Sequence, residues 1–205
     1  MMLIIKQGLL LRLFFTSVIA FVSFLGDLGL HYGKTEIIRA ISDNLTHAIV
    51  GGATWALILV LFKKSVIENI ENVIICFFMS SFIDIDHFIA ASSWDINDAT
   101  HLRHRPFLHC TTIPIFLWGL MSFLYKITHA SKWITYGTMI LASFLSHHVR
   151  DGNRRGLWFW PFGSTQPIPY YLYIAICILL PYTLQLLMSW QLSKDNDTIS
   201  SINVV

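Results

Sequence analysis

Six long apolar runs alternate with short polar connections along the 205 residues of this chain. They cover residues 8–30, 46–62, 69–91, 107–127, 133–149 and 168–190. A helix needs about 20 apolar residues to cross a bilayer, and backbone exposed to lipid must be helical because no water is there to satisfy it. The pattern therefore predicts an all-α membrane protein, a polytopic bundle of about six transmembrane helices.

Two of the runs leave the number of crossings open. Residues 46–62 and 133–149 span 17 residues each, which is the lower limit for a crossing helix. Either run could form a partly inserted or re-entrant helix. A bundle with four crossings is therefore the alternative to one with six.

The two ends of the chain carry separate expectations. Lys6 and the position of the first run also fit a signal peptide, but the run is longer than a usual h-region and lacks a clear small-x-small cleavage site. A retained helix is therefore expected there. At the other end, residues 193–205 are polar and are expected to form a short disordered tail after a single multi-pass domain over residues 1–192.

Composition supports the membrane class and excludes others. Hydrophobic residues make up 55% of the chain and charged residues only 13%, where a soluble domain has about a quarter. The net charge is +2 with no basic run, so no nucleic-acid-binding surface is expected. The three cysteines lie in apolar segments without metal-type spacing and imply no disulfide framework. The partner that the composition implies is the lipid bilayer.

The ionisable residues beside the apolar runs fall on one face of the membrane if the six runs cross alternately. This motif face receives Asp27, His47, Asp84, Asp86, His87, His104, His109, His147, His148 and Asp151. Ionisable groups at membrane depth are costly and usually mark a site. Random placement would scatter them over both faces, so we expect them to converge in one site.

Lysine and arginine divide evenly, seven on each face, so the positive-inside rule assigns no orientation. The motif face carries mostly arginine and the opposite face mostly lysine. Arginine binds phosphate and carboxylate groups bidentately. We therefore expect Arg105 and Arg150 to hold an anionic group, such as the phosphate of a lipid headgroup.

The histidine and aspartate residues match the needs of a catalytic metal, which takes about three protein ligands and keeps one position open. His147 and Asp151 are four residues apart and share one face of a helix. Asp84 and Asp86 are two apart, so they converge only where a helix ends, or one of them supports a ligand from behind. The full predicted ligand set for a divalent ion, Zn or Mn, is His47, Asp84, Asp86, His147, His148 and Asp151, with His104, Arg105 and His109 as predicted catalytic residues.

Structural interpretations stand beside the metal site. The same residues could form a hydrogen-bonded network without catalysis, and Asp27 could be an inter-helix hydrogen-bond partner. Asp43 fits an N-cap of the second helix, and the aromatic residues 158–162 fit an interfacial belt. An ion pathway is the third class, but no polar residues continue through the middle of the runs to the opposite face.

The order of these clusters resembles a known family. Thr46-His47, Asp84-Ile85-Asp86-His87, His104-Arg105 with His109, and Ser146-His147 with Asp151 are similar to the motifs of the YdjM-like family, over roughly residues 43–165. Two segments resemble the animal transmembrane protein 267 family more closely. They are Arg105-Pro106-Phe107-Leu108-His109-Cys110 and Ser146-His147-His148-Val149-Arg150-Asp151-Gly152.

The resemblance implies a membrane-bound protein of a family predicted to be metal-dependent hydrolases. Bacterial members usually have glycine, threonine and serine where this chain has Pro106, Leu108 and Cys110, while His104, Arg105 and His109 are retained. The first hypothesis is therefore a metal-dependent hydrolase acting on a membrane-associated lipid or other phosphoester. The alternative is a non-catalytic membrane protein that keeps the cluster as a structural metal site or network, and protein partners are not indicated.

Overall fold

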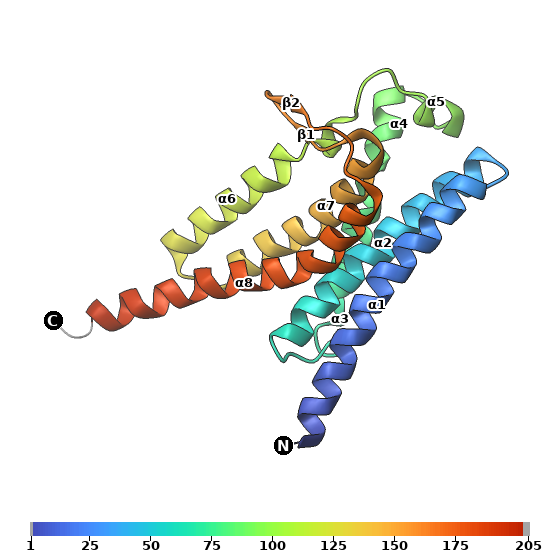
Figure 1. Cartoon of the computed structure of the whole chain (residues 1–205). Helices are drawn as coiled ribbons and strands as arrows, with labels where there is room; N and C mark the ends of the chain where they lie inside the picture. The colour runs from blue at the N-terminus through green and yellow to red at the C-terminus, as the bar shows by residue number, and fades with distance from the viewer. Residues whose placement is uncertain (1, 203–205) are drawn as a thin grey trace.

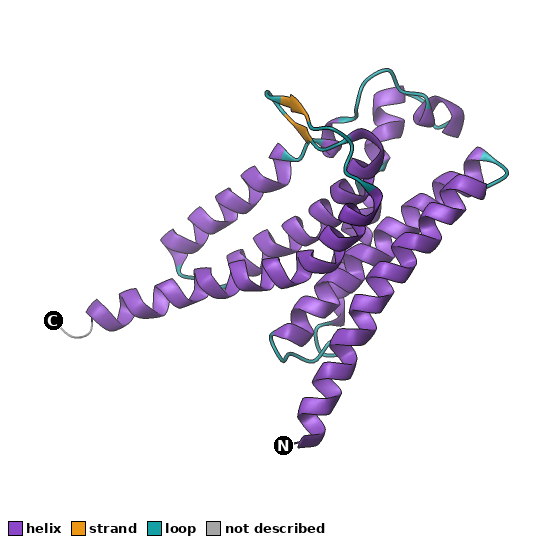
Figure 2. Cartoon of the chain, viewed as in Figure 1, coloured by secondary structure: helices purple, strands orange, loops and turns teal. Residues whose placement is uncertain are grey.

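Helices make up most of the computed structural model, which describes the backbone of residues 2–202 and the side chains of residues 6–193 (Figure 2). The described part of the chain contains α1 (Met2–Tyr32), α2 (Glu36–Leu61), α3 (Ile70–Phe82), α4 (Ile85–Ala91), α5 (Ile96–Thr100), the 3-10 turn η1 (Phe107–His109), α6 (Thr112–Thr128), α7 (Lys132–Arg155) and α8 (Tyr170–Ile202). Two short strands, β1 (Trp158–Phe159) and β2 (Gly163–Ser164), pair antiparallel between α7 and α8. The all-α class is thus confirmed.

The second helix begins ten residues earlier than its apolar run. Thr35 caps it by accepting the backbone N–H of Ile38 at 3.2 Å. Asp43 therefore lies inside α2, and its prediction as an N-cap was wrong. The early start adds nearly three turns that carry Asp43 and Asn44 toward the other polar residues.

Four helices of the described residues are long and apolar enough to cross a membrane. They are Lys6–Tyr32, Glu36–Leu61, Ile70–Ala91 and Tyr170–Ser193. Helix α6 is apolar but has 17 residues, and α7 is apolar only in its first two-thirds before it enters the polar cluster. Large apolar side chains such as Phe21, Phe78, Phe116 and Leu186 are exposed on the outside, where a bilayer would cover them. The chain is an integral membrane protein.

Helix α7 lies at the centre and contacts α2, α3, α6 and α8 (Figure 1). Its buried residues Met139 and Ala142 pack with Trp55 of α2, Cys76 of α3 and Leu184 of α8. Helix α1 covers α2 from outside. The two helices approach closely because Gly26 has no side chain, and a Cβ there would lie 2.1 Å from Thr46 Oγ1.

The connections that carry the polar residues gather at one end of the bundle, where Figure 1 places the α1–α2 turn, α4, α5 and the β1–β2 hairpin. Gly156 makes the turn that starts this hairpin, with φ +70°, and a Cβ there would lie 2.1 Å from the carbonyl oxygen of Thr165. Trp160 and Phe162 are exposed between the two strands. At the C-terminus α8 continues to Ile202 and residues 203–205 lie outside the described part, so the disordered tail stays a prediction.

Candidate metal centre

Three segments that are distant in the sequence supply the centre of the polar cluster. His147 and Asp151 lie one turn apart near the end of α7, as their spacing predicts. Asp84 lies at the break between α3 and α4, and His109 ends η1. The break matters because it redirects the chain between Asp84 and Asp86, so that both carboxylates reach the same histidine.

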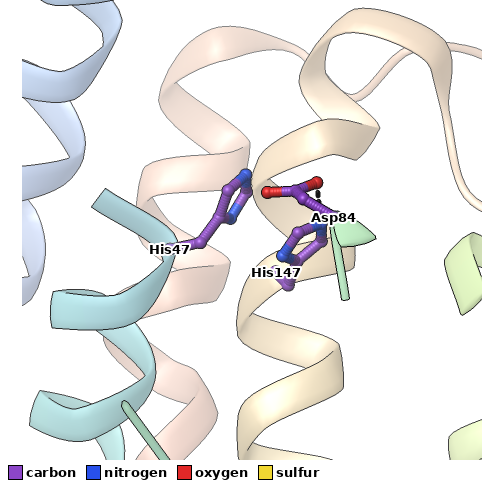
Figure 3. A group of neighbouring side chains, drawn as sticks. All are labelled: His47, Asp84 and His147. Carbon is purple, nitrogen blue, oxygen red and sulfur yellow. Dashed lines mark ion pairs between the residues drawn. The ribbon is translucent and has the colours of Figure 1, made fainter. Parts of the chain in front are cut away.

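Four atoms of these residues face one another. His147 Nε2 lies 3.2 Å from His109 Nε2, 3.4 Å from Asp84 Oδ1 and 3.5 Å from Asp151 Oδ2. His109 Nε2 lies 3.5 Å from Asp84 Oδ1 and 3.3 Å from Asp151 Oδ2. Figure 3 shows Asp84 above the ring of His147, with the ring of His47 beside it.

Five of these separations suit ligands of a single metal ion, and the sixth joins the two carboxylate oxygens. Nitrogen and oxygen ligands at 2.0–2.2 Å from a tetrahedral zinc stand roughly 3.3–3.5 Å from one another. Five of the six separations among the four donor atoms lie between 3.2 and 3.5 Å. The donor set of two imidazoles and two carboxylates suits zinc and also manganese.

The outer nitrogens of both rings are held by buried acceptors. His147 Nδ1 lies 2.9 Å from the carbonyl oxygen of Ser80, and His109 Nδ1 lies 3.3 Å from the fully buried carboxylate of Asp86. A carbonyl or carboxylate at this position fixes the proton on Nδ1 and turns the lone pair of Nε2 inward. Two imidazole lone pairs and two carboxylate oxygens then share one point, which favours a cation there.

The pKa of His109, which lies in the turn ahead of α6, shows how strongly the surrounding carboxylates favour a positive charge at this position. Burial disfavours protonation of the ring, but hydrogen bonds to three surrounding carboxylates outweigh burial and raise its pKa to about 11. The carboxylate side chains of Asp84 and Asp151 keep 26% and 22% of their surface exposed. The site therefore attracts positive charge and remains open on one side.

A second polar layer surrounds the four donor atoms. Asn44 donates to Asp84 Oδ2 at 3.1 Å and to the carbonyl oxygen of Ser81 at 2.8 Å, which fixes Asp84 against α2. Arg154 bridges the carboxylates of Asp43, at 2.9 Å, and Asp151. Burial opposes the charge of Arg154, but the two carboxylates outweigh it and hold the pKa of its guanidinium above the ordinary value.

A buried ion-pair network extends from this layer to the first helix. Arg150 is 2% exposed and pairs with Asp27 of α1 at 3.0 Å and with Asp43 of α2. The hydroxyl of Tyr173, on α8, donates to Asp27. Asp27 is thus an inter-helix partner. Arg150 faces internal carboxylates, and the structure gives no support to its prediction as a ligand for an external anion.

Three further residues predicted for the site lie around the four donor atoms. His47 is buried, stacks on His147 with ring centroids 3.7 Å apart, and places Nε2 3.4 Å from Asp151 Oδ1. It can join His147 and Asp84 as a ligand. Asp86 supports His109 from behind, one of the two roles expected for it. Arg105, half-buried, donates to the carbonyl oxygens of Gly156 and Arg155.

Two predicted residues are not brought into the cluster as ligands. His148 directs Nε2 to the carbonyl oxygen of Leu108 at 2.9 Å and Nδ1 to Thr111 Oγ1 at 3.3 Å, so both nitrogens already have partners. Its ring lies on a different side of α7 from that of His147 because adjacent helical residues diverge by about 100°. His104 is exposed in the loop between α5 and η1.

His87 and Asn44 belong to the site although no role was predicted for them. His87 Nδ1 donates to the carbonyl oxygen of Ala99, 3.0 Å away, and one nitrogen of His87 lies within 4.8 Å of ligand atoms of Asp84 and His109. Its place beside Asp86 was a usable sequence signal. Asn44 offered none, because amides near a helix end are common.

Fold and cluster together define a polytopic membrane protein with a histidine–aspartate site at one end of its helical bundle. The chain belongs to the YdjM inner membrane protein family, whose family model matches residues 43–202. This matched segment contains all of the donor residues described above.

The chain is also similar to vertebrate proteins. Transmembrane protein 267 of Danio rerio is 42% identical over 165 residues, which cover 80% of this chain and 72% of the relative. The proteins of the same name from Xenopus laevis and Mus musculus are 41% identical over 152 residues (74% of this chain, 69% of the relative) and 39% identical over 165 residues (80% and 74%). No solved structure matches the chain.

Proposed function

We propose that this protein is a metal-dependent hydrolase that acts on a membrane-associated phosphoester. The observation that carries the proposal is the group of His109, His147 and Asp151, whose ligand atoms lie 3.2–3.5 Å from one another, with Asp84 beside them. A structural zinc site is closed by four protein ligands, whereas a catalytic ion needs three and keeps one position open for water, so three of the four donors suffice here. Asp84, His109 and Asp151 line a cavity of about 950 Å³, which supports the catalytic alternative.

A divalent ion in this site would lower the pKa of a water molecule and polarise a phosphoryl oxygen. In the hydrolysis an oxygen of water bonds to phosphorus, the ester P–O bond breaks, and the proton lost by water is balanced by one gained by the leaving oxygen. His87 lines the cavity beside Asp84 and His109, and is the side chain placed to carry that proton.

The anionic part of the substrate needs cationic side chains near the donor atoms. Arg105 and Arg155 both line the cavity. Arginine presents several N–H donors in one plane, which suits phosphate oxygens. This favours a phosphoester over a neutral ester. Arg105 then binds the anionic group, as the sequence predicts, and takes no part in proton transfer.

The test is turnover of a panel of phosphomonoesters and phosphodiesters by metal-loaded protein in mild detergent or nanodiscs. Asp151→Asn should abolish turnover while yield and thermal stability stay close to those of the parent. Asp98→Asn is the matched control, because Asp98 is exposed and does not line the cavity. Metal-loaded, monodisperse protein without turnover on any ester would overturn the proposal.

The second candidate is a non-catalytic protein that uses the cluster to hold its helices together. The Arg150–Asp27–Asp43 network and the Asn44–Ser81 hydrogen bonds favour it, because they join α1, α2, α3 and α7. Under this alternative Asp151→Asn lowers yield and thermal stability together. The same variant therefore separates the two functions.

A further inference from the structure

The cavity beside the donor atoms is lined by residues of two kinds. Its polar lining includes Asp84, His109 and Asp151 together with arginine side chains. Its apolar lining comes from one face of α2 and from phenylalanine side chains of α3 and α4. On α2 this face consists of Ile41, Leu45 and Ala48, whose spacing places them on one side of the helix. A ligand that fills the cavity must therefore be amphiphilic.

Part of the apolar lining is also exposed on the outside of the bundle. Ile41 is 60% exposed and Phe82 on the facing helix is 60% exposed, although both line the cavity. They belong to two of the candidate membrane spans, Glu36–Leu61 and Ile70–Ala91. Exposed apolar residues on spanning helices face acyl chains. The cavity therefore opens sideways, between α2 and the α3–α4 pair, toward the bilayer.

The charges of the polar lining residues indicate the head group of such a ligand. Four arginines (Arg39, Arg105, Arg154 and Arg155) and four carboxylates (Glu36, Asp43, Asp84 and Asp151) line the cavity. Their charges cancel, so a divalent ion in the site leaves the lining with two positive charges. A phosphate monoester carries about −1.5 to −2 at pH 7 and neutralises this excess. A zwitterionic head group, whose phosphate is balanced by its own ammonium, does not.

We propose that the cavity admits a membrane lipid with a terminal phosphate monoester, which enters laterally between α2 and the α3–α4 pair. Its chain lies along Ile41, Leu45 and Phe82, and its phosphate reaches the donor atoms and Arg155. This inference rests on the proposed function for the place of the phosphate. The volume of about 950 Å³ lies within the range of roughly 300–1,000 Å³ found for ligand pockets.

The experiment measures binding rather than turnover. Metal-loaded protein in nanodiscs of dioleoyl phosphatidylcholine is titrated with the non-hydrolysable phosphonate analogue of dioleoyl phosphatidic acid, and separately with glycerol 3-phosphate from the aqueous side. Ile41→Trp narrows the lateral opening. Ile37→Trp is the matched control, since Ile37 is 54% exposed on the same helix but does not line the cavity.

We expect Ile41→Trp to weaken binding of the lipid phosphonate at least tenfold and to change binding of glycerol 3-phosphate less than twofold. Ile37→Trp should leave both within twofold. Arg155→Gln should weaken both ligands severalfold, while Arg103→Gln, in the exposed loop and outside the cavity, should weaken neither. Saturable lipid binding that Ile41→Trp leaves unchanged overturns lateral entry. Lateral entry is also overturned if Ile41→Trp weakens binding of the lipid phosphonate and of glycerol 3-phosphate equally.

The outcomes separate this inference from the proposed function. Binding of glycerol 3-phosphate alone, with turnover of soluble phosphoesters, overturns the lipid substrate and leaves the hydrolase intact. Lipid binding that Ile41→Trp weakens, without turnover of any ester, overturns the hydrolase and leaves the lipid site intact. Equal competition by a phosphatidylcholine phosphonate analogue overturns the preference for a monoester.

Discussion

The Nε2 atoms of His109 and His147 lie 3.2 Å apart, although 38 residues separate the two histidines in the chain. Both rings hold their Nδ1 atoms against a buried acceptor, so two nitrogen lone pairs point at the same place. Such an arrangement is repulsive unless a proton or a metal ion lies between the rings. The predictions below follow from this contact and from the layers around it.

Purified protein should contain a divalent metal ion whose binding depends on the four donor atoms. The double variant His147→Ala, Asp151→Ala should lose it, because two of the four donor atoms are removed. His104→Ala should retain it, since His104 is exposed in a separate loop. Elemental mass spectrometry of monodisperse protein measures this. Stoichiometric metal that survives the double variant, or protein that stays metal-free after reconstitution, would contradict the site.

The metal content should be one equivalent rather than two. Asp43, His47 and Asp151 form a second group of ligand atoms close enough for an ion. The guanidinium groups of Arg150 and Arg154 contact the carboxylates of this group and supply its positive charge. Reconstitution with excess zinc or manganese followed by desalting checks the number. Two tightly held equivalents in the parent protein would show that the arginines move aside.

Asp86→Asn should weaken metal binding by about 10–100-fold without removing a ligand. Asp86 holds His109 Nδ1 from behind and accepts the backbone N–H of Leu108 at 2.7 Å. Carboxylates in this position raise the basicity of the ligand histidine, and their loss typically costs that factor. Competition with a chelator of known affinity measures it. The control is Asp98→Asn, which should leave the affinity unchanged.

Arg150→Met should destabilise the bundle by about 3–5 kcal/mol, the usual cost of removing one partner from a buried ion pair. Asp27 and Asp43 would then lose their buried cation. Thermal unfolding in detergent, followed by tryptophan fluorescence, measures the loss. The double variant Arg150→Met, Asp27→Asn should recover part of it, because one uncompensated carboxylate is removed. Equal stability of Arg150→Met and the parent would mean that the network contributes nothing.

Gly156→Ala should lower stability by about 2 kcal/mol or more, because its positive φ is strained for alanine and its Cβ would meet the carbonyl oxygen of Thr165. Gly163→Ala shares the positive φ, but a Cβ there has no atom within 4 Å. It should cost about 1 kcal/mol. The difference in melting temperature between the two variants isolates the contact. A larger loss for Gly163→Ala would contradict this description of the turn.

Hydrophobic patterning by itself determined the class of this protein. Each of the six apolar runs is mostly helical, because lipid leaves no other way to satisfy the backbone of such long segments. The four-residue spacing of His147 and Asp151 also predicted correctly that they share a helix face, since that relationship is local. The gathering of Asp84, His109 and His147 followed from alternate crossings alone.

Only the tertiary structure decided which polar residue does what. His147 and His148 are chemically identical neighbours, and the rotation of α7 sends one to the donor cluster and the other to Leu108 and Thr111. Arg150 resembled an anion-binding residue until α1 and α2 placed Asp27 and Asp43 against it. The early start of α2 likewise turned Asp43 from a cap into an ion-pair partner. These roles depend on distances across helices, and residues far apart in the chain meet only after the bundle packs.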